Sequence, residues 1–274
     1  MASIKEIDII DVAFAHNPGM SLDNVPKHVK WVRGRPGRVP IRFFTDRSIG
    51  QVDNYPADVN VALLVEPICF DETGYNVFLA KAQQFKYCLT YDENFKQKLG
   101  DKGLLYAIGG CWIRPEQQRL HAKHRMTSII ASEKRQTHGH QLRHVAIDRF
   151  RKHMDVFGRG YSPVQFKSEA LADYRFSVVI ENGMIDTLFT EKLIDCFLCG
   201  TIPLYWGTPK IAEHFNMDGV IMFPEMDELG ALLAGLTEDD YSRRAAAVAD
   251  NFERAMRYRV AEDYIFEKYP FLIP

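Results

Sequence analysis

Two short polar clusters carry the residue types that hold a phosphorylated ligand. Glu-Asn-Gly at 181–183 directly follows an apolar run, and Thr-Glu-Lys at 190–192 opens a stretch with helical periodicity. A helix start presents unpaired N–H groups and the positive end of the helix dipole, which together suit a pyrophosphate. The same residues also fit an ordinary helix start, with Thr190 as N-cap, Glu191 in the first turn and Lys192 in solvent.

The elements that must position these clusters alternate between strand and helix. We expect a strand at 175–180 and then a helix at 190–200, in which Leu193, Ile194, Phe197 and Leu198 form one apolar face before Gly200 ends it. Further strands are expected at 126–131, 154–158, 201–207 and 219–223, and helices at 139–152, 209–215, 225–236 and 237–259. This alternation predicts a doubly wound parallel α/β domain, whose ligands bind beyond the carboxyl ends of the strands.

The first half of the chain is less regular. Residues 17–50 are rich in Gly, Pro and basic residues and indicate loop with short strands, whereas Asp-Val-Asn-Val-Ala-Leu-Leu-Val at 58–65 indicates a buried strand that ends at Glu66 and Pro67. We expect two domains, 1–123 and 124–274. The aromatic end of the chain is a candidate to pack back on the first domain.

The segment 176–216 resembles the donor-binding core of the family 10 glycosyltransferases, the α1,3/4-fucosyltransferases, and is most similar to their bacterial type. The resemblance rests on the apolar strand, Glu-Asn, a loop of about seven residues, Thr-Glu-Lys, a helix and Ile-Pro-Leu-Tyr-Trp-Gly at 202–207. Upstream segments extend it over 126–223, and a weaker likeness covers 61–89.

This resemblance implies a GT-B fold, in which two Rossmann-like, doubly wound domains face each other across a cleft. It also implies an enzyme that moves fucose from GDP-fucose to a hydroxyl of a glycan acceptor, in the family an N-acetylglucosamine. Matched by position, Arg143 and Lys192 neutralise the donor phosphates, Glu191 bonds the ribose hydroxyls, and Asn182 contacts the phosphate and fucose.

Inverting glycosyl transfer needs a carboxylate that takes the proton of the acceptor hydroxyl. Glu66 resembles the Glu of the family's Glu-Ser-Pro stretch and is the candidate base, with Asp71 and Glu72 as alternatives. A strand-end glutamate that bonds a neighbouring loop amide is the competing interpretation.

The sequence departs from the family at Leu188, where a tyrosine is usual. A transferase that uses another sugar nucleotide therefore stays open, as does an inert module that binds a sugar nucleotide or a glycan. Acceptor specificity is expected to reside in loops of the first domain, and the sequence of these loops does not identify the acceptor.

Metal ligands are not indicated, and we expect no required cofactor. No two aspartates lie two positions apart, so the Asp-x-Asp motif of metal-dependent GT-A transferases is absent. Cys196 and Cys199 have no second pair. The histidines at 121, 124, 138, 140 and 144 form a metal site only if two loops converge.

The composition indicates a globular protein of the cytoplasm. Its 274 residues carry 34 Lys and Arg against 36 Asp and Glu, and the five cysteines are scattered. This balance gives no indication of nucleic-acid binding, and no apolar run is long enough for a transmembrane segment. The basic segment 27–47 is expected to be a solvated loop; contact with an anionic, lipopolysaccharide-like acceptor or a membrane surface is the alternative.

Overall fold

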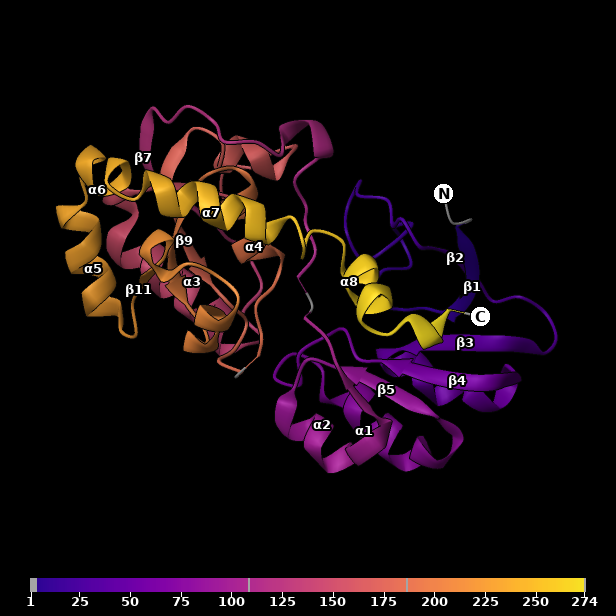
Figure 1. Cartoon of the computed structure of the whole chain (residues 1–274). Helices are drawn as coiled ribbons and strands as arrows, with labels where there is room; N and C mark the ends of the chain where they lie inside the picture. Colours follow the sequence, from indigo (N-terminus) through magenta and orange to yellow (C-terminus); the bar gives the residue numbers. More distant parts are fainter. Residues whose placement is uncertain (1–3, 108, 186, 274) are drawn as a thin grey trace. The chain divides into compact units, whose positions relative to one another are not determined.

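The chain divides into two compact units in the computed structural model, which describes residues 4–107, 109–185 and 187–273. Unit 1 comprises Met1–Ile108 with Val260–Pro274, and unit 2 comprises Gly109–Arg259. Residues 109–123, which we grouped with the first half, thus lie in unit 2, where the amide of Trp112 donates to Asp195 at 2.7 Å. The C-terminal segment lies in unit 1 (Figure 1).

Unit 1 is built on a parallel sheet whose described strands follow the order β2-β1-β3-β4-β5-β6. Their bounds are β1 Lys5–Ile10, β2 Val29–Arg33, β3 Val39–Thr45, β4 Ala57–Leu63, β5 Tyr87–Thr90 and β6 Gly103–Leu105. The expected strand at 58–65 is confirmed as β4, and the irregular 17–50 segment contains β2 and β3. A 3-10 helix, η1 (Asp46–Asn54), follows β3 directly.

Helices cover both faces of this sheet. One face packs on η1, α1 (Glu72–Lys81) and α2 (Glu93–Leu99), and the apolar core there includes Phe44, Ile49 and Phe78. On the other face the C-terminal helix α8 (Ala261–Lys268) packs Phe266 against Trp31 and Phe43, with ring centroids 5.9 Å apart in both pairs. This apolar contact ties the end of the chain to the first strands.

Unit 2 also has a parallel sheet, with its described strands in the order β11-β10-β9-β7-β8. The strands are β7 Arg125–Ile130, β8 Asp155–Phe157, β9 Tyr174–Ile180, β10 Ile202–Trp206 and β11 Ile221–Met222. Each corresponds to a predicted strand, and the pairing is parallel throughout, as predicted.

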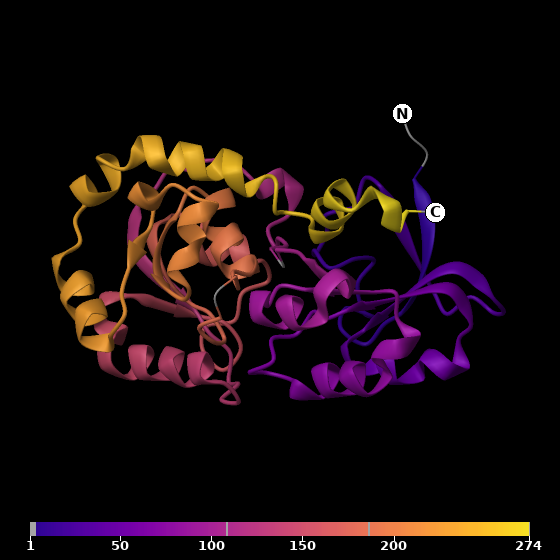
Figure 2. The same ribbon diagram turned by 60° about the horizontal axis from the view of Figure 1, so that its bottom comes forward.

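The helices of unit 2 lie on both faces of its sheet (Figure 2). Alternate β9 residues Phe176, Val178 and Ile180 enter the core shared with α3 (His138–Phe150) and α5 (Met226–Gly235). Helices α4 (Glu191–Leu198) and α7 (Ala245–Ala255) pack together on the opposite face. The predicted helix at 209–215 is a short 3-10 helix, η7 (Pro209–Glu213), and the predicted 237–259 helix is divided into α6 (Glu238–Ser242) and α7.

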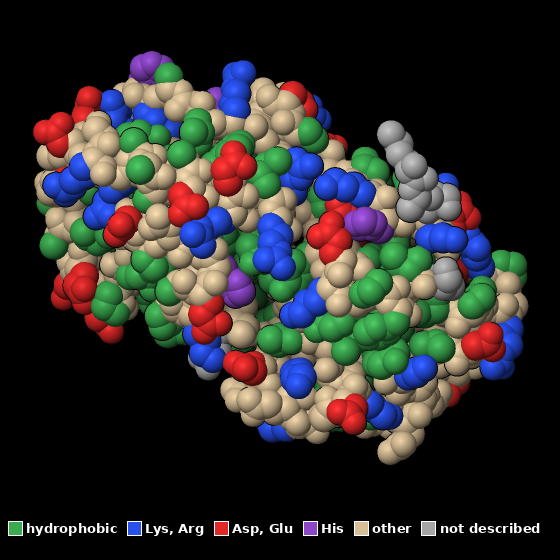
Figure 3. Space-filling view, viewed as in Figure 1, with side chains coloured by type: hydrophobic (Ala, Val, Ile, Leu, Met, Phe, Trp, Pro, Cys, Tyr) green, Lys and Arg blue, Asp and Glu red, His purple; other side chains and the backbone are tan. Residues whose placement is uncertain are grey.

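Two doubly wound parallel sheets confirm the predicted α/β class. None of the described helices has the length and hydrophobicity to cross a lipid bilayer. In the view of Figure 3, basic and acidic side chains are interspersed over the surface, in agreement with the near-zero net charge.

Candidate functional site

The strand order of unit 2 creates a switch point between β7 and β9. After β7 the chain passes through α3 to β8 on one side, whereas β9 leads through α4 to β10 on the other. Where two such connections leave a parallel sheet in opposite directions, a crevice opens at the carboxyl ends of the strands. The side chains that follow β9 and begin α3 and α4 lie at this edge.

Glu181, directly after β9, joins that strand to the start of α4. Its side chain is fully buried and accepts hydrogen bonds from the amide of Thr190 at 2.9 Å and from the Thr190 hydroxyl at 2.8 Å. The ammonium of Lys192 lies 3.4 Å from Oε2, the carboxylate oxygen that the Thr190 hydroxyl bonds. Glu181 therefore fixes the first turn of α4, a role that we did not predict from the polar 181–183 cluster.

The carboxylate of Glu191 lies between two lysines. Its Oε1 is 3.3 Å from Nζ of Lys192 and 3.5 Å from Nζ of Lys167. Burial raises the pKa of Glu191, but the two ammonium groups outweigh it and bring the pKa down to about 2. Glu191 is therefore an anion at every physiological pH, held in place as a hydrogen-bond acceptor.

Lys167 is a site residue that the sequence analysis missed. It comes from η6 (Lys167–Ala170), before β9, and also pairs with buried Asp195 at 2.9 Å. Its ammonium lies 4.6 Å from the ring centroid of Trp112, a cation–π contact. Residue 167 belongs to no periodic pattern in the sequence. One indirect signal was Asp195, an acidic residue on the buried face of a predicted helix, because a buried carboxylate needs a cationic partner.

Arg143 and Asn182 lie together at the end of β9. The buried guanidinium donates from Nε to the Ile180 carbonyl at 2.9 Å and from Nη2 to Oδ1 of Asn182 at 2.9 Å. Burial lowers the pKa of Arg143, while the charges of Glu181 and Glu191 act in the opposite direction. Arg143 therefore lies close enough to Glu181 and Glu191 to sense their charges.

Helix α3 begins in close contact with the same strand end. The amide of Gly139 donates to the Asn182 carbonyl at 3.1 Å, and a Cβ at Gly139 would lie 1.7 Å from the Glu181 carbonyl oxygen. Thr137 caps the helix by accepting from the amide of His140 at 3.1 Å. Glycine at 139 thus lets the α3 N-terminus reach the edge where Lys192 lies.

Positive charges surround His140 at the start of α3. Burial lowers the pKa of His140 to about 4, and the positive charges of Arg143, Lys134 and Lys192 lower it further. Arg143 and Lys192 bring positive charge to the switch point, where the carboxylates of Glu181 and Glu191 also lie. An anionic ligand there gains from fixed charges and from the first turns of α3 and α4.

Glu66 lies in unit 1, where it follows β4 and is half-buried. Its amide donates to Asp46 Oδ1 at 3.3 Å. Of the alternatives, Asp71 caps α1 through the amide of Thr73 and pairs with Arg47 at 2.7 Å, while Glu72 is exposed in the first turn. Asp71 is thus engaged as a helix cap and as the partner of Arg47.

The remaining sequence signals do not form a site. Cys196 and Cys199 are buried free thiols in and after α4, and burial raises the pKa of both. The histidines bond separate neighbours, such as Asp173 for His124 and Tyr161 for His144. Within the described ranges, no group of three or more His, Cys, Asp or Glu side chains is placed to hold a metal ion.

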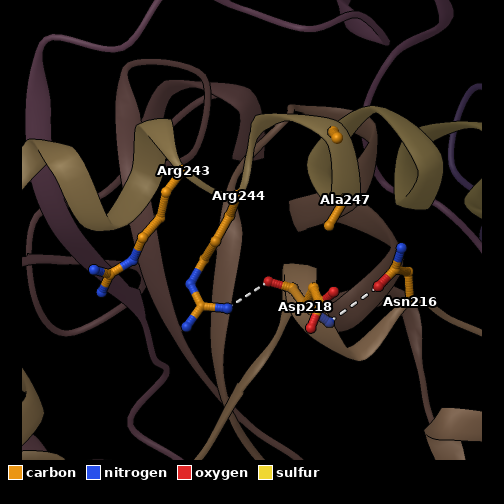
Figure 4. A pocket seen from close by; sticks show the side chains of 6 residues that line it. Asn216, Asp218, Arg243, Arg244 and Ala247 are labelled. Atoms are coloured by element: carbon orange, nitrogen blue, oxygen red, sulfur yellow. Dashed lines mark hydrogen bonds between the residues drawn. The ribbon is translucent and has the colours of Figure 1, made fainter.

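A depression of about 380 Å³ lies elsewhere in unit 2, between the start of α7 and η8 (Met217–Gly219) (Figure 4). Asn216, Asp218, Arg243 and Arg244 line it, and Arg244 donates to the Asp218 carbonyl. Its opposed charges and its position before β11, at the amino end of that strand, separate it from the switch-point edge.

Residues 120–245 match the family described as glycosyltransferase family 10 (fucosyltransferase), C-terminal domain. The chain is 44% identical over 57 residues to the alpha-(1,3)-fucosyltransferase FucT of Helicobacter pylori, which is 21% of this chain and 12% of that protein. It is 34% identical over 74 residues, 26% of the chain, to GDP-fucose protein O-fucosyltransferase 3 of Bos taurus. The matched segments span only 12% and 16% of these two relatives.

Solved structures show the fold over almost the whole chain. A crystal structure of an alpha1,3-fucosyltransferase with GDP superposes with a TM-score of 0.58 at 16% identity, covering 94% of this chain and 91% of the other. Anabaena HepE in complex with UDP and glucose gives a TM-score of 0.62 at 10% identity, covering 98% and 99%. Both likenesses place the chain in the GT-B fold class, and the predicted resemblance to family 10 is confirmed.

Proposed function

We propose that this chain, which carries the C-terminal domain of the family 10 fucosyltransferases over residues 120–245, transfers fucose from GDP-fucose to a hydroxyl of a glycan acceptor with inversion. The observation that carries the proposal is that Arg143, which bonds Asn182, and the Lys192–Glu191 pair, whose lysine contacts Glu181, lie at the end of β9. These residues combine a fixed anion with cations, as a nucleoside diphosphate requires.

In this proposal the donor pyrophosphate lies against the first turns of α3 and α4. Lys192 and Arg143 carry the positive charge, and the helix starts supply oriented N–H groups. Glu191, held as a carboxylate by Lys192 and Lys167, accepts from the ribose hydroxyls. Asn182, oriented by Arg143, contacts the phosphate and the sugar.

The chemistry follows from where charge develops. As the bond from fucose to the diphosphate breaks, the leaving phosphate gains negative charge, and preorganised cations stabilise that charge without a proton transfer. Lys192 and Arg143 therefore act on the leaving group, and no metal is required. Glu66 takes the proton from the acceptor hydroxyl as that oxygen attacks the sugar carbon.

GDP-fucose is the first donor to test, because the relatives are named for fucose transfer. The fold alone does not select it, since HepE shares the fold and is described with UDP. Leu188, which stands where the family usually has a tyrosine, lies fully buried before α4. The departure at this position therefore alters the packing behind the site. Another sugar nucleotide is for this reason the second candidate donor. A glycan is the proposed acceptor, and the Bos taurus relative adds a peptide to the screen.

The test is a calorimetric titration of the purified chain with GDP, GDP-fucose, GDP-mannose and UDP without added metal. The proposal expects the guanine nucleotides to bind and UDP to give no heat. Turnover of GDP-fucose is then followed with oligosaccharide and peptide acceptors, using Glu66→Gln as the inactive comparison. Faster GDP release from another sugar nucleotide would favour the second donor, and GDP binding without any turnover would favour an inert binding module.

A further inference from the structure

Asp46 is a buried carboxyl group in an unusual backbone conformation next to the proposed base. It is the first residue of η1, is only 3% exposed, and has a φ of +42°, in the left-handed region that side chains other than glycine rarely adopt. Strain of this kind persists where surrounding contacts enforce it, and it is concentrated at functional sites.

Helix α1 helps to hold Asp46 in this backbone conformation. Gly74 lies against the backbone of Asp46, and a Cβ at position 74 would lie 3.1 Å from Asp46 Cα. Tyr75, the next residue, is buried in the same core. The close approach of α1 therefore closes the site around Asp46 and keeps its carboxyl away from solvent.

The two oxygens of the Asp46 carboxyl have different surroundings. Oδ1 accepts from the amide of Val65 at 2.8 Å and from the amide of Glu66 at 3.3 Å. Oδ2 is buried and has no hydrogen-bond partner among the residues that the structure describes. An ionised carboxylate with one bare oxygen is costly in such a place, whereas a protonated one is much less so.

We propose that Asp46 is a positioning residue for Glu66: one oxygen of its carboxyl holds the peptide groups that carry Glu66, and the carboxyl keeps its proton on the other, buried oxygen. The inference rests on the proposed role of Glu66 as base. By keeping its proton, Asp46 adds no second negative charge beside Glu66.

The charges around Asp46 agree with this assignment. Burial raises its pKa to about 7, the charges of Glu66 and Asp71 add to the rise, and the two backbone hydrogen bonds oppose it. Arg47, the neighbouring cation, senses the charge of Asp46 but donates its hydrogen bonds to Asp71, at 2.7 and 3.2 Å. The other titratable groups that sense Asp46 are the phenols of Tyr75 and Tyr106, which bond Tyr91 and the Leu64 carbonyl respectively.

Two carboxyl groups close enough to sense each other's charge titrate as a coupled pair. The group in the drier environment keeps the proton to higher pH, because losing it creates a buried charge beside another carboxylate. Asp46 is that group, and Glu66, which is half-buried, is the one able to meet a substrate hydroxyl. Asp46 thus controls where the Glu66 peptide group stands and, while protonated, keeps a second charge away from it.

The experiment is a ¹³C NMR titration of the Asp and Glu carboxyl carbons in the full chain. The resonance lost in Asp46→Asn, which keeps an acceptor oxygen for the two amides, identifies Asp46. We expect this resonance to titrate near pH 7 in the unsubstituted chain and to move to lower pH by about 0.5 or more in Glu66→Gln, where the neighbouring charge is gone. Exposed Asp101, replaced by Asn, is the control that leaves the Asp46 midpoint in place.

An Asp46 midpoint below pH 5, or one that Glu66→Gln leaves unmoved, overturns the inference, because a merely structural Asp46 has no reason to sense residue 66. A turnover readout separates this failure from that of the proposed function. Asp46→Asn is expected to keep GDP affinity within about twofold, since nucleotide binds unit 2, and to lower kcat for GDP release about tenfold or more. Absence of turnover in the unsubstituted chain refutes the function and leaves the NMR result on the carboxyl pair decisive.

Discussion

The carboxylate of Glu181 bonds both the amide and the hydroxyl of Thr190, at 2.9 and 2.8 Å, and so connects the end of β9 to the first turn of α4. This connection determines where Lys192 and Glu191 stand relative to the switch point. A carboxylate used in this way is structural support for the proposed nucleotide site, and its removal affects stability first.

Glu181→Ala should lower the free energy of unfolding by about 3–5 kcal/mol, because it leaves the capping threonine and the half-buried Lys192 without their carboxylate. Urea denaturation followed by circular dichroism measures the change. Glu225→Ala is the matched control, since Glu225 precedes α5 as an exposed N-cap residue without a side-chain cap bond, and it should change stability by less than about 0.5 kcal/mol. Equal losses in the two variants would show that the Glu181 connection contributes nothing specific.

Lys192→Ala should weaken GDP binding by about 1.5–3 kcal/mol, which is the usual worth of a hydrogen bond to a charged group and corresponds to roughly 10- to 150-fold in Kd. Calorimetric titration measures this loss at low ionic strength. Lys152→Ala removes an exposed lysine of the same unit and should leave Kd unchanged. If Lys192→Ala binds GDP as tightly as the unsubstituted chain, Lys192 has no part in holding the phosphates.

Lys167 and Asp195 form a buried pair at 2.9 Å, and their substitutions should not be additive. Lys167→Met leaves Asp195 as an uncompensated buried charge and should cost about 3–5 kcal/mol in unfolding free energy. Adding Asp195→Asn removes that charge but keeps an acceptor for the Trp112 amide, so the double variant should recover at least about 1 kcal/mol. A double-mutant cycle by urea denaturation measures the coupling, and simple additivity would contradict a direct interaction.

The places of Arg143 and Lys192, the proposed donor-binding cations, could be predicted because they depend on local sequence pattern. Lys192 follows an N-capping threonine at the start of an amphipathic helix, and Arg143 lies in a helix between two predicted strands. Their proximity then follows from parallel strand order alone. Predicting the strands of unit 2 was therefore sufficient to bring these side chains to one edge.

What the sequence could not provide is the set of supporting contacts. Lys167 comes from an irregular segment whose path is set by tertiary packing, and the role of Glu181 depends on how the loop after β9 returns to α4. Asp46 adopts a left-handed conformation that no residue pattern announces for an aspartate. Each of these groups contacts a residue that is distant in sequence, and such contacts cannot be predicted from hydrophobic periodicity.

Gly139→Ala tests the close approach of α3 to β9. The added Cβ would lie 1.7 Å from the Glu181 carbonyl oxygen, so the helix start must shift, and we expect a loss of about 3 kcal/mol or more in unfolding free energy. Gly235→Ala is the control, because position 235 in α5 has no heavy atom within 4 Å of the added Cβ and should be neutral or slightly stabilising. Urea denaturation of both variants decides, and a neutral Gly139→Ala would show that the approach is not needed.

Asp46 should make stability depend on pH with a definite sign. Burial raises its pKa in the folded chain from 3.8 to about 7, so the folded state binds a proton that the unfolded state releases. The resulting stabilisation is fully present below about pH 4 and is lost as the pH rises through 7. At 1.36 kcal/mol per pH unit of pKa difference, this loss is on the order of 2–4 kcal/mol between pH 4 and pH 8.

Asp46→Asn removes this dependence, because the amide does not titrate. The unfolding free energy of the unsubstituted chain minus that of Asp46→Asn should therefore fall steadily from pH 5 to pH 8, whereas the same difference for the exposed Asp101→Asn should stay flat. Urea midpoints at four pH values measure both differences. A flat Asp46 difference would mean that the carboxyl is already ionised in the folded chain at pH 5, and Glu66 would then have a permanently charged neighbour instead of a partner that holds the proton.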